Sequence, residues 1–173
     1  MMLYDLKDYI ISQLSNIPSC IYWSLILVLI ISLILLTVRK ETFPFHTILR
    51  LLLVEYIVMT FMLTIVFRDV RESFEYNYMP LWSYGRSYLL KQIIMNVISF
   101  IPIGFLLKGS LPKWSTLKII GAGVFVSSII EITQFLLRRG FSELDDIIHN
   151  TLGVFIGCIL YNTIIKSCRS FLN

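Results

Sequence analysis

Charged side chains are scarce in this chain of 173 residues, at 15% against 57% hydrophobic residues. A soluble domain usually carries about 25% charged residues, and so small a supply of charge cannot cover a surface that faces water. The mean hydropathy of +0.79 agrees with lipid as the main solvent. The composition therefore argues against an ordinary soluble domain and predicts an integral membrane protein.

Residue patterns of several common functional sites are also missing. The three cysteines, Cys20, Cys158 and Cys168, lack metal-ligand spacing, and Cys20 and Cys158 in apolar runs are expected to act as small hydrophobes. His149 follows Asp146 closely, but the histidine spacing of a zinc site is absent. There is no glycine-rich phosphate loop and no basic groove. We therefore expect no metal, no cofactor and no nucleic-acid partner.

Residues 1–17 resemble a helix that lies on a membrane rather than a cleaved signal peptide. No basic stretch precedes an apolar run, and no small-residue cleavage site follows one. Apolar residues recur at helical spacing while Asp5, Lys7 and Asp8 occupy the other face. The apolar positions are Leu3, Leu6, Ile10, Leu14 and Ile17. The pattern predicts an amphipathic interfacial helix.

About five runs are long enough to cross a hydrocarbon core, which takes roughly 20 helical residues. They are Ile21–Val38, Ile48–Phe67, Leu89–Leu107, Ile119–Leu137 and Ile147–Ile165. The expected fold class is all-α, a polytopic helical bundle. We divide it into the interfacial helix 1–17, a first span with its turn at 18–44, a four-helix core at 45–165 and a short basic tail at 166–173.

The membrane orientation rests on acidic residues, because Lys and Arg are nearly balanced between the two sides of a five-span topology. Most acids outside the spans fall on the side of the N-terminus, and Glu41 falls on the other. The positive-inside rule gives acids little weight. The expectation is an outside N-terminus and an inside C-terminus.

Glu131 is the central polar residue of the predicted core. An ionisable residue inside a span is costly and is by default a candidate for a functional site. Its span carries polar residues on one helical stripe, at positions Ser127, Glu131, Gln134 and Arg138. The neighbouring spans add two further stripes, Asn96 with Gly104, and Asp146 with Asn150, Gly153 and Gly157.

The depth of these residues brings them to one leaflet. Glu131 lies six residues before the end of its span, and Asn96 and Asp146 lie near the starts of theirs. We therefore expect three helices to present polar groups to a shared cavity. The alternative is that the side chains only hydrogen-bond the helices to one another. For Glu131 with Asp146 we favour a function, because two acids are an expensive way to join helices.

These residues together resemble the VanZ-like family of bacterial membrane proteins. The resemblance covers roughly residues 45–162, and a Pro80-containing loop ahead of the third span resembles a family motif. Either Arg138 or Arg139 can fill the family's arginine position. The matching residues are Asn96, Phe100, Pro102, Gly104, Ser127, Glu131, Gln134, Arg139, Asp145, Asp146, Asn150, Thr151, Leu152, Gly153 and Gly157.

The resemblance implies a multi-pass protein of the bacterial cytoplasmic membrane, and the family takes its name from a member linked to teicoplanin resistance. The first functional hypothesis is recognition of a membrane lipid or a lipid-linked cell-wall precursor. Arginines, including Arg68 and Arg71, would meet phosphate by charge-assisted hydrogen bonds. The candidate ligand-binding residues are Asn96, Ser127, Glu131, Gln134, Arg138, Arg139, Asp145, Asp146 and Asn150.

The second hypothesis is an intramembrane enzyme that acts on a lipid-linked substrate. Glu131 would be its general acid/base, with Asp146 as a stabiliser or metal ligand. The sequence leaves open whether a reaction is catalysed and which oligomeric state the protein adopts.

Overall fold

The computed structural model describes residues 22, 25–26, 29–30, 45–84 and 89–172. The chain divides into two compact units, Met1–Thr42 and Phe43–Asn173. In the first unit the described residues are helical. The predicted interfacial helix 1–17 and most of the predicted span 21–38 lie outside the described residues. The second unit holds all the candidate site residues.

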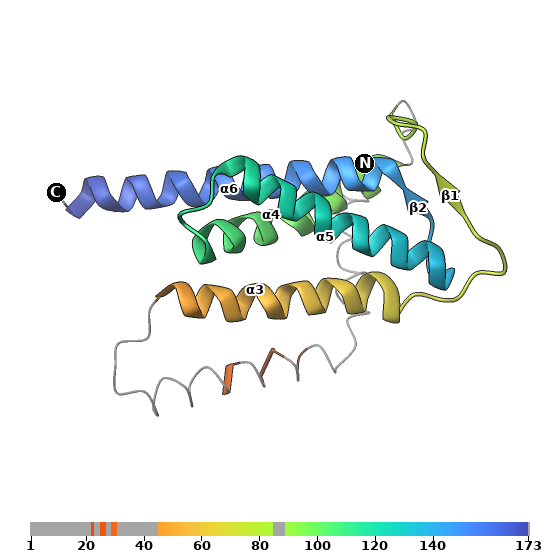
Figure 1. The fold of residues 1–173 in the computed structure, drawn as a ribbon, viewed down its shortest axis with the longest axis horizontal. Helices are drawn as coiled ribbons and strands as arrows, with labels where there is room; N and C mark the ends of the chain where they lie inside the picture. The colour runs from red at the N-terminus through yellow and green to blue at the C-terminus, as the bar shows by residue number, and fades with distance from the viewer. Residues whose placement is uncertain (1–21, 23–24, 27–28, 31–44, 85–88, 173) are drawn as a thin grey trace, which may run out of the picture. The chain divides into compact units, whose positions relative to one another are not determined.

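Four long helices build the second unit (Figure 1): α3 (Phe45–Phe61), α4 (Leu90–Ser110), α5 (Thr116–Leu137) and α6 (Leu144–Leu172). α3 continues directly into a π-helical segment, η1 (Met62–Val66). By length and composition, four helices in the described part of the chain can cross a membrane. The predicted all-α membrane bundle is therefore confirmed, and its last four spans coincide with helices.

The segments that can cross a membrane are His46–Val66, Leu90–Ser110, Thr116–Leu137 and Leu144–Ile165. Their bounds differ from the predicted bounds by a few residues. The fourth begins three residues earlier than predicted, because Asp145 and Asp146 form the first turn of α6. Carboxylates are favourable there, since they face the unsatisfied backbone amides at a helix N-terminus.

α4 and α6 approach each other backbone to backbone. A Cβ atom on Gly153 would meet the carbonyl oxygen of Val97, and one on Gly157 would meet that of Ile101. Gly104 of α4 faces the backbone of Val154 in the same way. Small residues allow such close packing of helices in lipid, where dispersion replaces the hydrophobic effect as the main attraction.

Pro102 lies inside α4 and cannot donate the usual hydrogen bond to the carbonyl four residues earlier. In lipid, a neighbouring helix or a nearby hydroxyl such as that of Ser99 is expected to compensate for this loss. The hydroxyl of Tyr56 on α3 donates to the carbonyl of Ser99, at 3.0 Å. A neighbouring helix thus supplies a polar contact next to the proline, although to Ser99 rather than to the carbonyl that lost its partner.

A short parallel pair of strands joins the loops at one end of the bundle (Figure 1). β1 (Tyr76–Asn77) pairs with β2 (Ser142–Glu143), so that Tyr76 lies beside Ser142 and Asn77 beside Glu143. β2 leads directly into α6 at Leu144. The pairing therefore fixes the segment before α6 against the long loop that comes after η1.

Candidate functional site

Three carboxyl groups meet at the end of the bundle that carries β1 and β2. Oε2 of Glu131 accepts a hydrogen bond from the backbone nitrogen of Glu143, at 3.0 Å. Nε2 of Gln92 donates to the carboxylates of both Glu143 and Asp146, the latter at 3.2 Å. Glu131 and Glu143 are buried. We call Gln92, Glu131, Glu143 and Asp146 the carboxyl cluster.

Two predicted residues extend the carboxyl cluster. Asn96 of α4 interacts with Asp146, although its amide nitrogen has no hydrogen-bond partner of full geometry among the described residues. Asn150 lies one helical turn after Asp146, and its amide nitrogen donates to Oγ of Ser127, at 2.8 Å. Ser127 lies one turn before Glu131 on α5. The polar stripes of α5 and α6 therefore face each other.

Glu143 lies just before α6, outside the membrane-spanning segment, where its carboxyl group has little access to water. Burial, followed by the charge of neighbouring Asp146, raises the pKa of Glu143 to about 7. Burial disfavours the charged form of an acid, and a second carboxylate disfavours it further. The cluster can therefore take up or release a proton near neutral pH.

Arg68 is the basic residue that reaches the carboxyl cluster from the end of η1. It interacts electrostatically with both Glu131 and Asp146. Its side chain passes over Gly140, where a Cβ atom would lie 2.7 Å from Nη1 of Arg68. Gly140 has a φ of 125°, which side-chain-bearing residues rarely adopt. The backbone conformation thus requires glycine, and a Cβ atom at this position would also displace the flexible end of the Arg68 side chain.

Arg139 holds the backbone around Arg68 rather than the carboxyl cluster. Its Nη1 donates to the carbonyls of Ile65, Val66 and Arg68, at 3.3, 2.5 and 3.1 Å. The last carbonyls of a helix lack internal partners, and a guanidinium group can satisfy several of them. Arg139 therefore fixes the end of η1, from which the side chain of Arg68 departs.

The other two predicted residues near the end of α5 have different partners. Nε2 of Gln134 donates to the carbonyl of Thr64, at 3.1 Å, and the side chain is buried. Arg138 ends α5 in the left-handed conformation, with φ 54°, and Nη1 donates to the carbonyl of Glu72. Its guanidinium also lies over the ring of Phe74, 5.7 Å from the centroid. Arg138 thus contacts the long loop, away from the cluster.

Asp145 anchors the loop that precedes α4. It accepts hydrogen bonds from the backbone nitrogens of Leu81 and Ser83 and from Oγ of Ser83, at 2.5, 2.9 and 2.5 Å. Next to it, Nε2 of buried His149 lies 3.1 Å from the hydroxyl of Tyr84. Asp145 and His149 therefore hold residues 81–84 against the start of α6.

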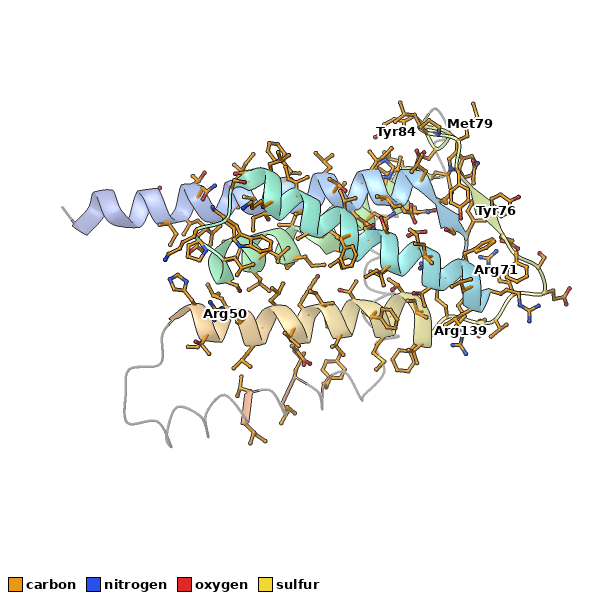
Figure 2. All side chains as sticks on the ribbon, in the orientation of Figure 1. Arg50, Arg71, Tyr76, Met79, Tyr84 and Arg139 are labelled. Carbon is orange, nitrogen blue, oxygen red and sulfur yellow. The ribbon has the colours of Figure 1, made fainter. Side chains whose placement is uncertain are left out.

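The loop residues gather at one end of the helices. Figure 2 shows Tyr76, Met79 and Tyr84 at the end of the bundle where Arg71 and Arg139 lie, with Arg50 at the opposite end. Several of these side chains are exposed, including 70% of Met79. Aromatic side chains are enriched where a membrane protein meets the lipid headgroups. The carboxyl cluster therefore lies at the end of the bundle that carries an exposed aromatic loop.

The structure divides the predicted site residues into two groups. Glu131, Asp146, Asn96, Ser127 and Asn150 lie together between α4, α5 and α6. Asp145, Arg138, Arg139 and Gln134 form hydrogen bonds to backbone groups of neighbouring segments. Ligand binding by either group stays a prediction.

Sequence reasoning missed two members of the carboxyl cluster. Gln92 donates to two carboxylates, and it lies four residues before Asn96 on the same face of α4. That spacing was a usable signal. Glu143 falls between two predicted spans, and only its pairing with β1 and the resulting turn into α6 bring it to Glu131.

Within the described residues, no three His, Cys, Asp or Glu side chains are arranged so that they could hold a metal ion. His149, Glu131 and Asp145 do not converge on one point, because each contacts a different residue. The partners are Tyr84 for His149, the backbone nitrogen of Glu143 for Glu131, and the backbone nitrogen of Leu81 for Asp145.

Comparison with known proteins gives one family. The sequence model of the family described as VanZ/LLP1 matches residues 25–166 of this chain. The curated Protein VanZ of Enterococcus faecium is 32% identical over 103 residues, which cover 50% of this chain and 60% of that protein. The chain thus spans about 60% of the length of this relative. No solved structure matches.

Proposed function

Because the chain belongs to the VanZ/LLP1 family, we propose that its carboxyl cluster recognises the polar head of a lipid-linked or cell-envelope ligand at the membrane. The single observation that carries this proposal is the meeting of three carboxyl side chains from α5, β2 and α6. Gln92 donates to those of Glu143 and Asp146, and Glu131 accepts from the backbone nitrogen of Glu143. A helix-joining role would need far fewer charges.

The surroundings of the cluster suit a lipid-linked ligand. Arg68 lies beside the carboxyl groups, and a guanidinium group binds phosphate through paired, charge-assisted hydrogen bonds. Exposed aromatic and apolar side chains on the loop at the same end offer contacts for the lipid part of the ligand. A head with one phosphate group and several hydrogen-bond donors would find complementary partners here, the phosphate in Arg68 and the donors in the carboxyl groups.

A role in teicoplanin resistance is part of the proposal, because teicoplanin is a lipoglycopeptide whose target is a lipid-linked cell-wall precursor. Recognition of that precursor, or of the antibiotic's lipid-bearing end, would change how the two meet. The 32% identity to Protein VanZ supports this connection.

The test is Glu131→Gln in the full chain, expressed in a teicoplanin-sensitive bacterium. The substitution keeps the size of the side chain and one oxygen that can accept from Glu143, while it removes the charge. We expect loss of any protection at unchanged protein levels in the membrane. The matched control is Glu72→Gln, which removes an exposed carboxylate outside the cluster. Equal protection by both variants would contradict the proposal.

A second candidate function is an intramembrane enzyme with Glu131 as general acid/base. The observation that favours it is the pattern of hydrogen bonds at this side chain. Oε2 accepts from Glu143, which leaves Oε1 for another partner. The second oxygen of a buried carboxyl group can exchange a proton with a ligand. Under this hypothesis Glu131→Gln abolishes turnover of a lipid-linked substrate while binding persists.

A further inference from the structure

The carboxyl cluster has more carboxyl groups than basic neighbours. In the described part of the chain, Arg68 is the basic residue that interacts with Glu131 and Asp146, and Glu143 adds a third carboxyl group. Among the described residues, none of these three acids lies within 4.0 Å of a basic nitrogen as an ion pair. The ion pair in this part of the chain joins Arg71 to Glu75. A ligand with one positive charge would therefore supply these carboxyl groups with an ion-pair partner that the described residues do not give them.

Two unpartnered oxygen atoms belong to residues on the same helix faces as the acids. Oε1 of Gln134 and Oδ1 of Asn150 have no hydrogen-bond partner among the described residues, and the side chains are 3% and 4% exposed. The nitrogens of both amides already donate, to Thr64 and Ser127. The open positions on these two amides are therefore acceptors, while the amide nitrogen of Asn96 is an open donor near Asp146. An unsatisfied buried acceptor is costly, and a ligand that donates to it recovers that cost.

These acceptors belong to the same polar stripes as the acids. Gln134 follows Glu131 by three residues on α5, which puts both on one face of the helix. Asn150 follows Asp146 by four residues on α6. Asn150 therefore offers an open acceptor one helical turn from Asp146, whereas the amide of Gln134 is directed toward Thr64.

The chemistry of this carboxyl-rich site selects among cations. No group of His, Cys, Asp and Glu in the described residues is arranged to hold a metal ion. A trimethylammonium group has no N–H to offer the open amide oxygens, and such groups are usually bound by aromatic cages. A primary ammonium group has a single positive charge and three N–H donors, which match carboxylate and amide oxygens.

We propose that the carboxyl cluster binds a primary ammonium group, with Arg68 placed to meet an anionic group of the same ligand. This inference rests on the proposed function and names the chemical class of the ligand: a head that carries an amine close to a phosphate or carboxylate. Such a head can belong to an aminated phospholipid or to an amine-bearing, soluble compound.

The first experiment compares lipids on the wild-type protein, so that no variant has to fold. The full chain is reconstituted in nanodiscs of phosphatidylglycerol with equal small amounts of phosphatidylethanolamine and phosphatidylcholine, and the lipids retained after gentle detergent extraction are measured by native mass spectrometry. We expect a preference of about tenfold or more for phosphatidylethanolamine, the ratio that one charge-assisted hydrogen bond can supply.

The second arm identifies the source of the amine. Phosphoethanolamine and phosphocholine are added as soluble probes, and the thermal midpoint of the protein is measured. Stabilisation by phosphoethanolamine alone, without a lipid preference, supports an amine from a soluble source. The preference for phosphatidylethanolamine should fall about tenfold in Glu131→Gln and in Asp146→Asn, and the stabilisation by phosphoethanolamine should decrease in the same variants. Both effects should persist in Glu72→Gln.

The outcomes separate this inference from the proposed function. Equal retention of both lipids and equal effects of both probes would overturn the ammonium site. If the equal binding of these lipids or probes still depended on Glu131, the proposed function would stand without the ammonium site. If no probe or lipid depended on Glu131, both proposals would be rejected.

Discussion

α6 is packed against its two neighbours in contrasting ways. Toward α4 it presents Gly153 and Gly157, whose Cα atoms lie against backbone atoms of the facing helix, with Phe105 N only 2.7 Å from where a Cβ of Gly157 would be. Toward α5 it presents side chains that reach across, such as Asn150 to Ser127. We call these interfaces the glycine interface and the polar interface.

The contrast shows how one helix can serve both stability and a site. In the glycine interface the distance between helices is fixed by backbone contact, and no side chain can be added without separating them. In the polar interface the contacts run through flexible side chains, each worth only about 0.6 kcal/mol on average in membranes. Rigid packing on one side therefore leaves the other side free to carry polar groups for a ligand.

The largest expected loss of stability is that of Gly153→Val, at the glycine interface. The new side chain would collide with the carbonyl of Val97 and with Cβ of Phe100, 2.9 Å from the first added atom. Overpacking usually costs about 1–3 kcal/mol, and a backbone collision belongs at or above the upper end of that range. We expect a fall in the thermal midpoint of the detergent-solubilised protein of roughly 6 °C or more.

The matched control for this variant is Gly121→Ala. No atom lies within 4 Å of a Cβ built on Gly121, and the residue is exposed on α5. Alanine favours helix formation over glycine by about 0.8–1 kcal/mol. We expect an unchanged or slightly higher midpoint. Equal destabilisation by both variants would mean that the glycine interface has no special role.

The glycine interface was partly predictable from the sequence. The spacing of Gly153 and Gly157, two small residues four apart, is typical of a helix that a partner can approach closely, and Asn96 and Gly104 share a face of the neighbouring helix. Helical periodicity carries this information because the packing depends on one face of one helix. The partner residues, such as Val97, depend on the crossing of two helices and could not be read from spacing.

The polar end of α6 was predicted less completely. Glu131 was recognised because acids are rare in spans, and Asp146 because it shares a helical face with Asn150. Glu143, in contrast, belongs to a loop by every sequence criterion. Its place depends on strand pairing over a separation of about sixty-five residues, which local patterns do not encode. The loop-anchoring role of Asp145 was missed for the same reason.

The second largest expected loss of stability is that of a variant at Asp145, which lies at the polar end of α6. Asp145→Ala removes an acceptor of three hydrogen bonds and leaves the amides of Leu81 and Ser83 without it. Unsatisfied buried donors cost about 1–3 kcal/mol. We expect faster proteolysis within the 78–84 loop, measured by limited digestion in nanodiscs, with a smaller change in the thermal midpoint than Gly153→Val causes.

Asp69→Asn is the control for that experiment, because Asp69 is exposed and lies on another part of the loop. Its digestion pattern should match that of the wild type. If Asp145→Ala is digested no faster than this control, the loop is held by other contacts, such as that of Tyr84 with His149.

The third effect depends on pH and concerns Glu143. Its pKa in the folded protein, about 7, lies above the ordinary value of 4.5, because of burial and then Asp146. The folded protein therefore binds more protons than the unfolded chain between these values, so stability is highest at the acidic end and falls as the pH rises through 7. Gln92 donates to the same carboxylate and partly offsets this effect, while Asp145 adds to it.

Thermal unfolding at pH 5 and pH 8 measures this effect. We expect Glu143→Gln to reduce the fall in midpoint between the two values by about 2–4 °C, the change that ~1 kcal/mol produces in a chain of this size. Glu72→Gln, at an exposed position, should keep the wild-type pH profile. An identical slope in Glu143→Gln and wild type would show that other groups govern the pH dependence.

The smallest effect lies in the polar interface itself, at Ser127→Ala. The substitution leaves Nδ2 of Asn150 without the acceptor that it has at 2.8 Å, but it removes no packing atoms beyond the hydroxyl oxygen. If polar contacts here serve a ligand more than stability, the loss should be about 0.6 kcal/mol, near the average for such pairs. That is about 1–2 °C in the thermal midpoint. A loss as large as that of Gly153→Val would mean that the polar interface holds the bundle together, and the contrast between the two faces of α6 would disappear.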